Sequence, residues 1–301
     1  MRIQHNLNAM NSLRQLGTNN TNTGKNLEKL SSGFRINRAG DDAAGLAISE
    51  KMRAQINGLE MASKNAEDGI SLIQTAEGGL NETHSILQRM RELAVQAANG
   101  TNKDEDLDSI QKEVDALVEE VGRIADSTKF NGIDLINGKL SGSGNELTLQ
   151  IGANTVTYIS GSGSGAAVAT QSGAGQYERV SLSIADMGKV GLGLETGSGT
   201  GLINLSTQSG AQAALVTLDE SIKLVSEQRA GLGALQNRLE HTVNNLGVTS
   251  ENLTAAESRI RDVDMAKEMM EYTKNNILTQ AAQAMLAQAN QQPQGVLQLL
   301  Q

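Results

Sequence analysis

The side chains that could catalyse a reaction or bind a metal are few and far apart in this sequence. Its three histidines are His5, His84 and His241, and they fall in three different predicted helices. No pair of them has the His-Glu-x-x-His spacing by which zinc proteases hold their metal. Because metal and catalytic sites need several such side chains close together, we interpret each histidine as structural. We therefore expect no metal, no cofactor and no enzymatic activity.

Two further groups of residues suggest chemistry but fit a structural role better. The glycine-rich stretch around Gly40 lacks the Lys-Ser or Lys-Thr pair with which phosphate-binding loops hold phosphate and metal. We expect Gly40 to end one helix and Asp41 or Asp42 to cap the next. The neighbouring acids Glu119 and Glu120 are interpreted as part of a solvated helix face.

The composition excludes several classes of function. The chain has 301 residues and a formal charge of −9, and it has no basic stripe to neutralise phosphates, so we do not expect nucleic-acid binding. Cysteine is absent, which excludes disulfides and suits a chain that travels unfolded. Residues 1–16 lack the apolar core of a cleaved signal peptide, and no later run reaches membrane-spanning length. Neither a cleaved signal nor membrane binding is expected.

One helical surface has a pattern that suits recognition by a partner. Its members are spaced at i, i+3, i+4 and i+7 on one predicted helix, with one more acid on the next helix: Arg89, Glu92, Leu93, Gln96 and Glu113. This stripe lies beside the predicted core stripe of Met90 and Ala94. We expect Leu93 to be an apolar residue on an exposed flank. The alternative is an ordinary solvated face with one scattered leucine, since single exposed apolar residues are common.

Long helices must carry this surface. Apolar residues recur at steps of three and four from 211 to 265, which predicts a helix of roughly 80 Å. Similar stripes predict helices over 59–98 and 107–124, joined by a loop at 99–103. The chain contains a single proline and only 2% aromatic residues, so it permits long helices and lacks the fillers of a wide core. We therefore predict a mainly α fold, a long antiparallel helical rod or coiled-coil bundle.

The centre of the chain predicts a small insertion that contains β-structure. The dipeptides Asn131-Gly132 and Asn137-Gly138 are typical of turns. Alternating apolar residues over 147–151 and 156–158 predict a β-hairpin, and those over 180–184 predict another strand. The Gly- and Ser-rich stretches 160–176 and 196–201 are interpreted as flexible surface loops.

The two ends of the chain have helical spacing but little else to stabilise them. In residues 1–35 the patch from 17 to 24 is a weak helix former, and we expect Pro293 to end the helix of the C-terminal tail. We expect residues 1–35 and 266–301 to become ordered only against a partner. The apolar residues that we expect to take part in assembly are Leu27, Leu30, Phe34, Ile260, Val263, Met269, Ile277, Leu286, Leu297 and Leu300.

Several stretches together resemble the bacterial flagellin family. They include LSSGFRINRAGDDAAGLAISE at 30–50, LQRMRELAVQAANGTN at 87–102, ENLTAAESRIRDVDMA at 251–266 and MLAQANQQPQGVLQLL at 285–300. The resemblance covers roughly residues 1–140 and 205–301. It implies a terminal coiled-coil domain lining an inner tube (1–44 and 266–301), a helical rod core (45–140 and 205–265), and a small variable insertion (141–204).

The resemblance also implies a function and partners. Flagellins are secreted without a cleaved signal and polymerise with themselves into the extracellular flagellar filament used for motility. The implied partners are an export chaperone at the C-terminal segment, hook-associated and cap proteins, and the flagellin-sensing Toll-like receptor of animal hosts. Arg89, Leu93, Gln96 and Glu113 match the residues by which stimulatory flagellins contact that receptor, and the same surface is implied to pack between subunits.

Three other functions remain as alternatives. The nearest is the homologous hook–filament junction protein, which the terminal motifs and the Arg89 stripe disfavour. A filament-borne enzyme is disfavoured by the missing metal motif. A non-flagellar coiled-coil adhesin would leave the terminal motifs unexplained.

Overall fold

The computed structural model describes residues 6–141, 146–153, 178–195 and 203–299, with the backbone alone described from 292 onward. Within these residues the chain forms five helices and two small antiparallel strand pairs. It divides into two compact units, one made of residues 1–56 and 251–301 and the other of residues 57–250. The fold is mainly α, as the sequence predicts.

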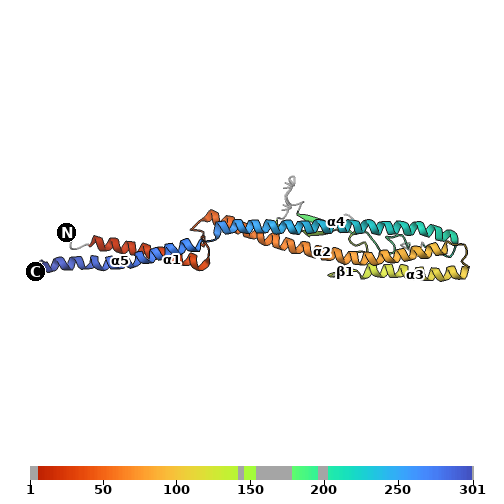
Figure 1. Ribbon diagram of the computed structural model, residues 1–301, viewed down its shortest axis with the longest axis horizontal. Helices are drawn as coiled ribbons and strands as arrows, with labels where there is room; N and C mark the ends of the chain where they lie inside the picture. Colours follow the sequence, from red (N-terminus) through yellow and green to blue (C-terminus); the bar gives the residue numbers. More distant parts are fainter. Residues whose placement is uncertain (1–5, 142–145, 154–177, 196–202, 300–301) are drawn as a thin grey trace, which may run out of the picture. The chain divides into compact units, whose positions relative to one another are not determined.

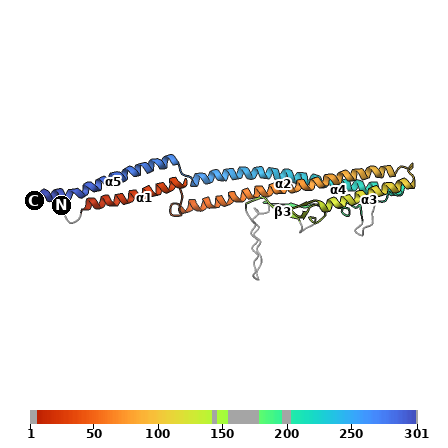
Figure 2. The same ribbon diagram turned by 90° about the horizontal axis from the view of Figure 1, so that it is seen from below.

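Two helices form most of the first unit. They are α1 (Leu7–Ser32) and α5 (Met265–Leu299), which lie side by side in Figures 1 and 2. Asn6 caps α1 by accepting from Ala9 N at 3.1 Å, and its Nδ2 donates to Ala289 O at 2.7 Å. Helix α1 runs without interruption through the weak patch at 17–24, because packing against α5 offsets low intrinsic propensity.

One stripe of each helix is half-buried or buried, and the two stripes form what we call the terminal seam. Its residues recur at steps of three and four, the spacing of a coiled coil. They are Asn6, Ala9, Ser12, Leu16, Asn19, Thr23, Asn26 and Leu30 on α1, and Glu268, Tyr272, Asn275, Thr279, Ala282, Leu286 and Ala289 on α5.

The helix boundaries of the first unit differ from the sequence-based expectations at three places. Helix α1 ends at Gly33 (φ 75°) rather than at Gly40, because the left-handed conformation that suits glycine closes its last turn. Helix α4 (Gln208–Arg261) ends short of residue 265, and the Asp264 carboxylate accepts from Ala266 N to cap α5. Helix α5 continues past Pro293 to Leu299, since proline's fixed φ is compatible with a helix, although proline lacks the N–H that would donate within it.

Three helices pack together in the second unit. They are the parts of α2 (Ala43–Ala97) and α4 (Gln208–Arg261) that lie in this unit, and α3 (Asp104–Ser127). Salt bridges join α2 to α4, from Arg91 to Asp219 at 2.6 Å and from Arg229 to Glu77 at 3.6 Å. Their order along the two helices makes the pair antiparallel, as predicted. The core is a continuous cluster of fully shielded side chains that includes Leu80, Leu87, Met90, Val114, Val121, Leu218, Leu232 and Leu239.

Short strands pack beside these helices. Strands β1 (Lys129–Phe130) and β2 (Ile133–Asp134) pair through a turn at Asn131 (φ 48°) and Gly132 (φ 79°), the turn predicted from that dipeptide. Strand β3 (Leu147–Gln150) pairs with β4 (Arg179–Leu182), so both predicted strand regions form. The predicted strand at 156–158 and the predicted loops at 160–176 and 196–201 lie outside the described residues.

Strand β3 and the residues after it pack against α2 at two glycines, which have no side chain to hold them away from the helix. A Cβ on Gly69 would meet Leu149 Cδ1 at 2.5 Å, and a Cβ on Gly58 would meet that of Ala153 at 2.8 Å. Between these glycines, Asn65 Nδ2 donates to Gln150 O at 3.1 Å. Two glycines and one amide thus fix the position of the strand pair on the helix.

Candidate interaction surfaces

The predicted recognition stripe forms a small charged surface across α2 and α3. Arg89 Nη2 donates to Glu113 Oε1 at 2.9 Å, and Arg89 Nη1 donates to Glu92 Oε2 at 3.3 Å. The side chains of Arg89, Glu92 and Glu113 are 53%, 70% and 46% exposed. Gln96 is also exposed. These four side chains are accessible to a partner, and we call them the Arg89 surface.

The charges on this surface are partly neutralised within the chain. The hydrogen bonds from Arg89 to Glu113 and then to Glu92 raise the pKa of the guanidinium above its ordinary value, so Arg89 stays cationic. Glu113 binds Nε and Nη2 of the guanidinium from α3, and Glu92 binds Nη1 from the same helix as Arg89. A partner carboxylate would have to compete with them for its planar donors.

The structure contradicts the expected exposure of Leu93. Only 3% of this residue is exposed, and it belongs to the core cluster. Helix α2 packs against α3 and α4, so its buried arc is wider than the single stripe of Met90 and Ala94. Leu93 therefore supports the Arg89 surface from beneath and cannot offer an apolar contact without repacking.

The turn that joins α2 to α3 holds the two sides of the Arg89 surface together. Asn102 Nδ2 donates to Gln96 O at 2.5 Å, which closes the end of α2. At the start of α3, Lys103 N donates to Asp106 Oδ2 at 3.2 Å. Because both helix ends are capped by local side chains, Arg89 and Glu113 are held at a fixed separation.

The residues expected to take part in terminal assembly divide into two sets. Leu27, Met269 and Ile277 point outward and are 55%, 49% and 60% exposed. Half-buried members are Leu30, Phe34, Ile260, Val263 and Leu286. The side chain of Leu297 and all of Leu300 lie outside the described residues.

The end of α1 contacts the break that separates α4 from α5. Phe34, Ile260 and Val263 lie at this contact. Arg35 N donates to Arg261 O at 2.6 Å, and Val263 N donates to Gly33 O at 3.0 Å, as in a short antiparallel ladder. The Arg261 guanidinium lies over the Phe34 ring, 4.6 Å from its centre. It also pairs with Glu50 at 3.1 Å. The two interruptions are therefore held to each other by backbone and side-chain bonds.

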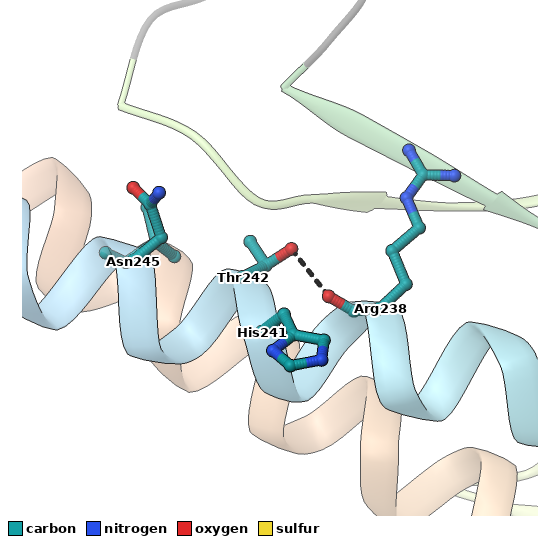
Figure 3. A pocket seen from close by; sticks show the side chains of 5 residues that line it. Arg238, His241, Thr242 and Asn245 are labelled. Atoms are coloured by element: carbon teal, nitrogen blue, oxygen red, sulfur yellow. Dashed lines mark hydrogen bonds between the residues drawn. The ribbon is translucent and has the colours of Figure 1, made fainter.

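The candidate catalytic and metal-binding residues are not brought together. His84 Nε2 lies 3.0 Å from Gln88 Nε2 on the same helix, and His5 is outside the described residues. His241 lines an open pocket on α4 with Arg238, Thr242 and Asn245, as Figure 3 shows. Thr242 Oγ1 donates to the helix carbonyl of Arg238 at 2.8 Å and is not free for chemistry.

Two observations on the described residues bear on ligands and membranes. In residues 6–141, 146–153, 178–195 and 203–299, no three His, Asp or Glu side chains gather closely enough to hold a metal ion. Among the helices of the same ranges, none combines the length and apolar character of a membrane span.

Sequence reasoning missed the polar residues of the terminal seam. Leu7, Met10 and Leu13 of the N-terminal apolar stripe are 58%, 57% and 59% exposed, so α1 turns other residues toward α5. Those residues include the half-buried Asn19 and the buried Asn26. A second 3-4 spacing of Asn, Thr and Ser residues in the same segment was the signal that could have revealed the seam.

Comparison with known proteins gives consistent matches along the chain. The family model of the bacterial flagellin N-terminal helical region matches residues 3–141, and that of the C-terminal helical region matches residues 215–300. A flagellin of Bacillus subtilis (strain 168) is 55% identical over 324 residues, covering 100% of both chains. The flagellar filament 33 kDa core protein of Treponema phagedenis is 51% identical over 300 residues, again covering 100% of both. A crystal structure of Bacillus cereus flagellin matches with 31% identity and a TM-score of 0.45, covering 64% of this chain and 94% of that one.

Proposed function

Because this chain belongs to the bacterial flagellin family, we propose that it is a structural subunit that polymerises with itself into the extracellular flagellar filament. Full-length identity of 55% and 51% to a flagellin and to a filament core protein supports this function. It also favours the filament over the hook–filament junction protein. Flagellins are structural proteins, so the chain is not an enzyme.

The observation that carries self-assembly is the outer face of the α1–α5 pair. Large apolar side chains there are half or more exposed: Leu7, Met10, Leu13, Leu27, Met270, Ile277 and Met285. Large apolar side chains gathered on the outside of one helix pair are typical of an interface. Copies of the same chain, packed around a common axis, would cover it.

Three finer functions follow from the family and from these surfaces. The chain is exported through the flagellar secretion apparatus, with a chaperone on its C-terminal segment, and it meets hook-associated and cap proteins in the growing flagellum. The terminal domain of 1–44 and 266–301 lines the inner tube, residues 45–140 and 205–265 form the helical rod core, and residues 141–204 form a small variable insertion. The lack of cysteine suits passage of an unfolded chain, since no crosslink can form on the way.

The Arg89 surface is the part of the chain that we assign to the flagellin-sensing Toll-like receptor and to a neighbouring subunit. Exposed, paired charges on Arg89, Glu92 and Glu113, with Gln96 beside them, offer several hydrogen bonds to a polar partner. Leu93 acts by packing beneath this surface and makes no direct contact. Both partners would use the same side chains, so binding to one would exclude the other.

Seeded polymerisation tests the assembly function. Purified chain should elongate filament fragments, whereas a chain trimmed to residues 45–265 should not, because it lacks the outer face of α1 and α5. Leu13→Gln with Ile277→Gln should slow elongation while leaving the melting of the second unit unchanged. The matched control is Asn20→Gln with Asn276→Gln, which changes exposed polar residues of the same helices. A trimmed chain that still formed filaments would overturn the proposal.

A further inference from the structure

Methionine is the main side chain of this sequence that a mild oxidant can modify. The chain has 10 methionines, no cysteine and no tryptophan. The thioether of methionine is polarisable, and a peroxide oxidises it to the sulfoxide where the peroxide can reach the sulfur. The positions of the methionines therefore decide which part of the molecule oxidation would change.

The exposed methionines gather in the first unit. Met10 of α1 and Met270 and Met285 of α5 lie on the outer face of the helix pair and are 57%, 68% and 63% exposed. Met265 and Met269, also on α5, are each 49% exposed and lie outside the terminal seam. A peroxide in solution can thus reach five sulfur atoms on this one helix pair.

The second unit holds its methionines differently. In its described residues, Met90 and Met187 belong to the core cluster and are 0% and 3% exposed. Met61 on α2 is the exposed one, at 54%. Oxidation of the folded chain would therefore alter the first unit much more than the second.

Oxidation would make the outer face of the α1–α5 pair polar. The sulfur lone pair forms the new S–O bond, the O–O bond of the peroxide breaks, and the displaced oxygen takes up the proton and leaves as water. Sulfur is oxidised and the peroxide is reduced. The sulfoxide oxygen is a hydrogen-bond acceptor, and burying it without a donor costs free energy. A face that must make apolar contacts would lose them at each modified methionine.

We infer that the exposed methionines of the first unit are oxidation sites, and that their conversion to sulfoxide stops the free chain from joining a filament. The sites are Met10, Met265, Met269, Met270 and Met285. Chains already in a filament are protected, because neighbouring copies cover the same sulfur atoms. The block is reversible, since methionine sulfoxide reductases restore the thioether. This inference rests on the proposed function, because it needs a polymer that covers the outer face.

Treating the full-length free chain with hydrogen peroxide before seeded polymerisation tests the inference. After catalase has destroyed the peroxide, light scattering follows elongation from untreated filament fragments. We expect elongation of the treated parent to be slowed at least about tenfold, and methionine sulfoxide reductase to restore it. Peptide mass spectrometry should find sulfoxide at the five sites and not at Met90 or Met187.

A leucine variant separates these sites from other effects of peroxide. Leucine is apolar, close to methionine in volume and inert to peroxide. The test variant is Met10→Leu with Met265→Leu, Met269→Leu, Met270→Leu and Met285→Leu. Its elongation should be equally fast before and after treatment. The control, Met61→Leu, removes the exposed methionine of the second unit and should remain as sensitive to peroxide as the parent. A test variant slowed by peroxide as much as the parent would contradict the inference.

A second measurement does not depend on assembly of the test variant. Peroxide treatment of assembled parent filaments should give at least about tenfold less sulfoxide at the five sites than treatment of the free chain. Equal oxidation would show that neighbouring copies do not cover these sulfur atoms. A parent that carries sulfoxide at the five sites and still elongates normally would overturn the inference alone. An untreated parent that fails to elongate would overturn the proposed function, and this inference with it.

Discussion

Replacing Arg89 with alanine separates recognition from stability on the Arg89 surface. The guanidinium bonds to Glu113 and Glu92 at 2.9 and 3.3 Å, and its side chain is 53% exposed. Ion pairs this exposed contribute little to stability. The core stripe through Leu87, Met90 and Ala94 is fully shielded and does not need Arg89. We therefore expect Arg89→Ala to keep its helical content and to lower the melting temperature by no more than about 4 °C.

Binding should respond more strongly than folding. A buried arginine at the centre of an interface is often one of the few residues that dominate affinity. The substitution also leaves Glu113 and Glu92 without their shared cation, so two acids would face the partner unpaired. We expect the affinity of the free chain for the receptor ectodomain to fall at least about tenfold, with most of the change in the dissociation rate. Surface plasmon resonance measures both.

Arg123 supplies the matched control. It lies on α3, is 65% exposed, and forms two hydrogen bonds to Glu120, at 2.5 and 2.8 Å. Arg123→Ala removes an exposed arginine that is paired with an acid outside the Arg89 surface, so it should leave receptor affinity unchanged. If Arg89→Ala binds as tightly as the parent, the surface is an ordinary solvated face. If both variants weaken binding equally, net charge alone explains the effect.

Four further substitutions test packing and electrostatics in the second unit. Leu93→Ala should lower the free energy of unfolding of the second unit by about 2–5 kcal/mol in urea, because it opens a cavity where the leucine is 3% exposed. A smaller loss of unfolding free energy would contradict the burial of Leu93. Hydrogen bonds from Lys139 and then Lys129 hold the pKa of Asp134 well below its usual range, so its contribution to stability is present above about pH 4 and is lost as pH falls further. On acidification, the melting temperature of Asp134→Asn should therefore fall less than that of the parent. An equal fall in both would contradict this prediction. Gly191→Ala should destabilise by about 1–3 kcal/mol, because its Cβ would meet Asp186 O at 2.2 Å, whereas Gly247→Ala, with nothing within 4 Å, should stabilise its helix by up to about 1 kcal/mol.

The second unit is largely predictable from its sequence. Apolar steps of three and four through Leu80, Leu87, Val114 and Leu218 coincide with the shielded core, because each helix there buries a face against its neighbours. The Asn131-Gly132 turn forms where the dipeptide predicts it, because that turn needs two positive φ values. Period and turn chemistry are local properties, so a single sequence reveals them.

What escaped prediction depends on neighbours that the sequence does not identify. Leu93 is buried because α2 packs against two helices, α3 and α4. The apolar periodicity of α2 alone does not reveal that it has a second neighbouring helix. In the terminal seam the apolar residues Met10 and Leu13 point outward while Asn26 is shielded, which reverses the usual inference from hydrophobic patterning. That rule assumes that a chain buries its apolar face within itself, and it fails where the intended neighbour is another molecule.

The ladder between β3 and β4 also shapes how the family can vary. It joins Gln150 to Arg179, so the intervening segment begins and ends at neighbouring points of the strand pair whatever its length. The entropy of closing such a loop grows only with the logarithm of its length, so doubling the segment costs about 0.6 kcal/mol. The helices bury their core away from this segment, so its length would not alter their packing. The length of the segment between these two strands can therefore change without disturbing the helix core, so the two are free to vary independently.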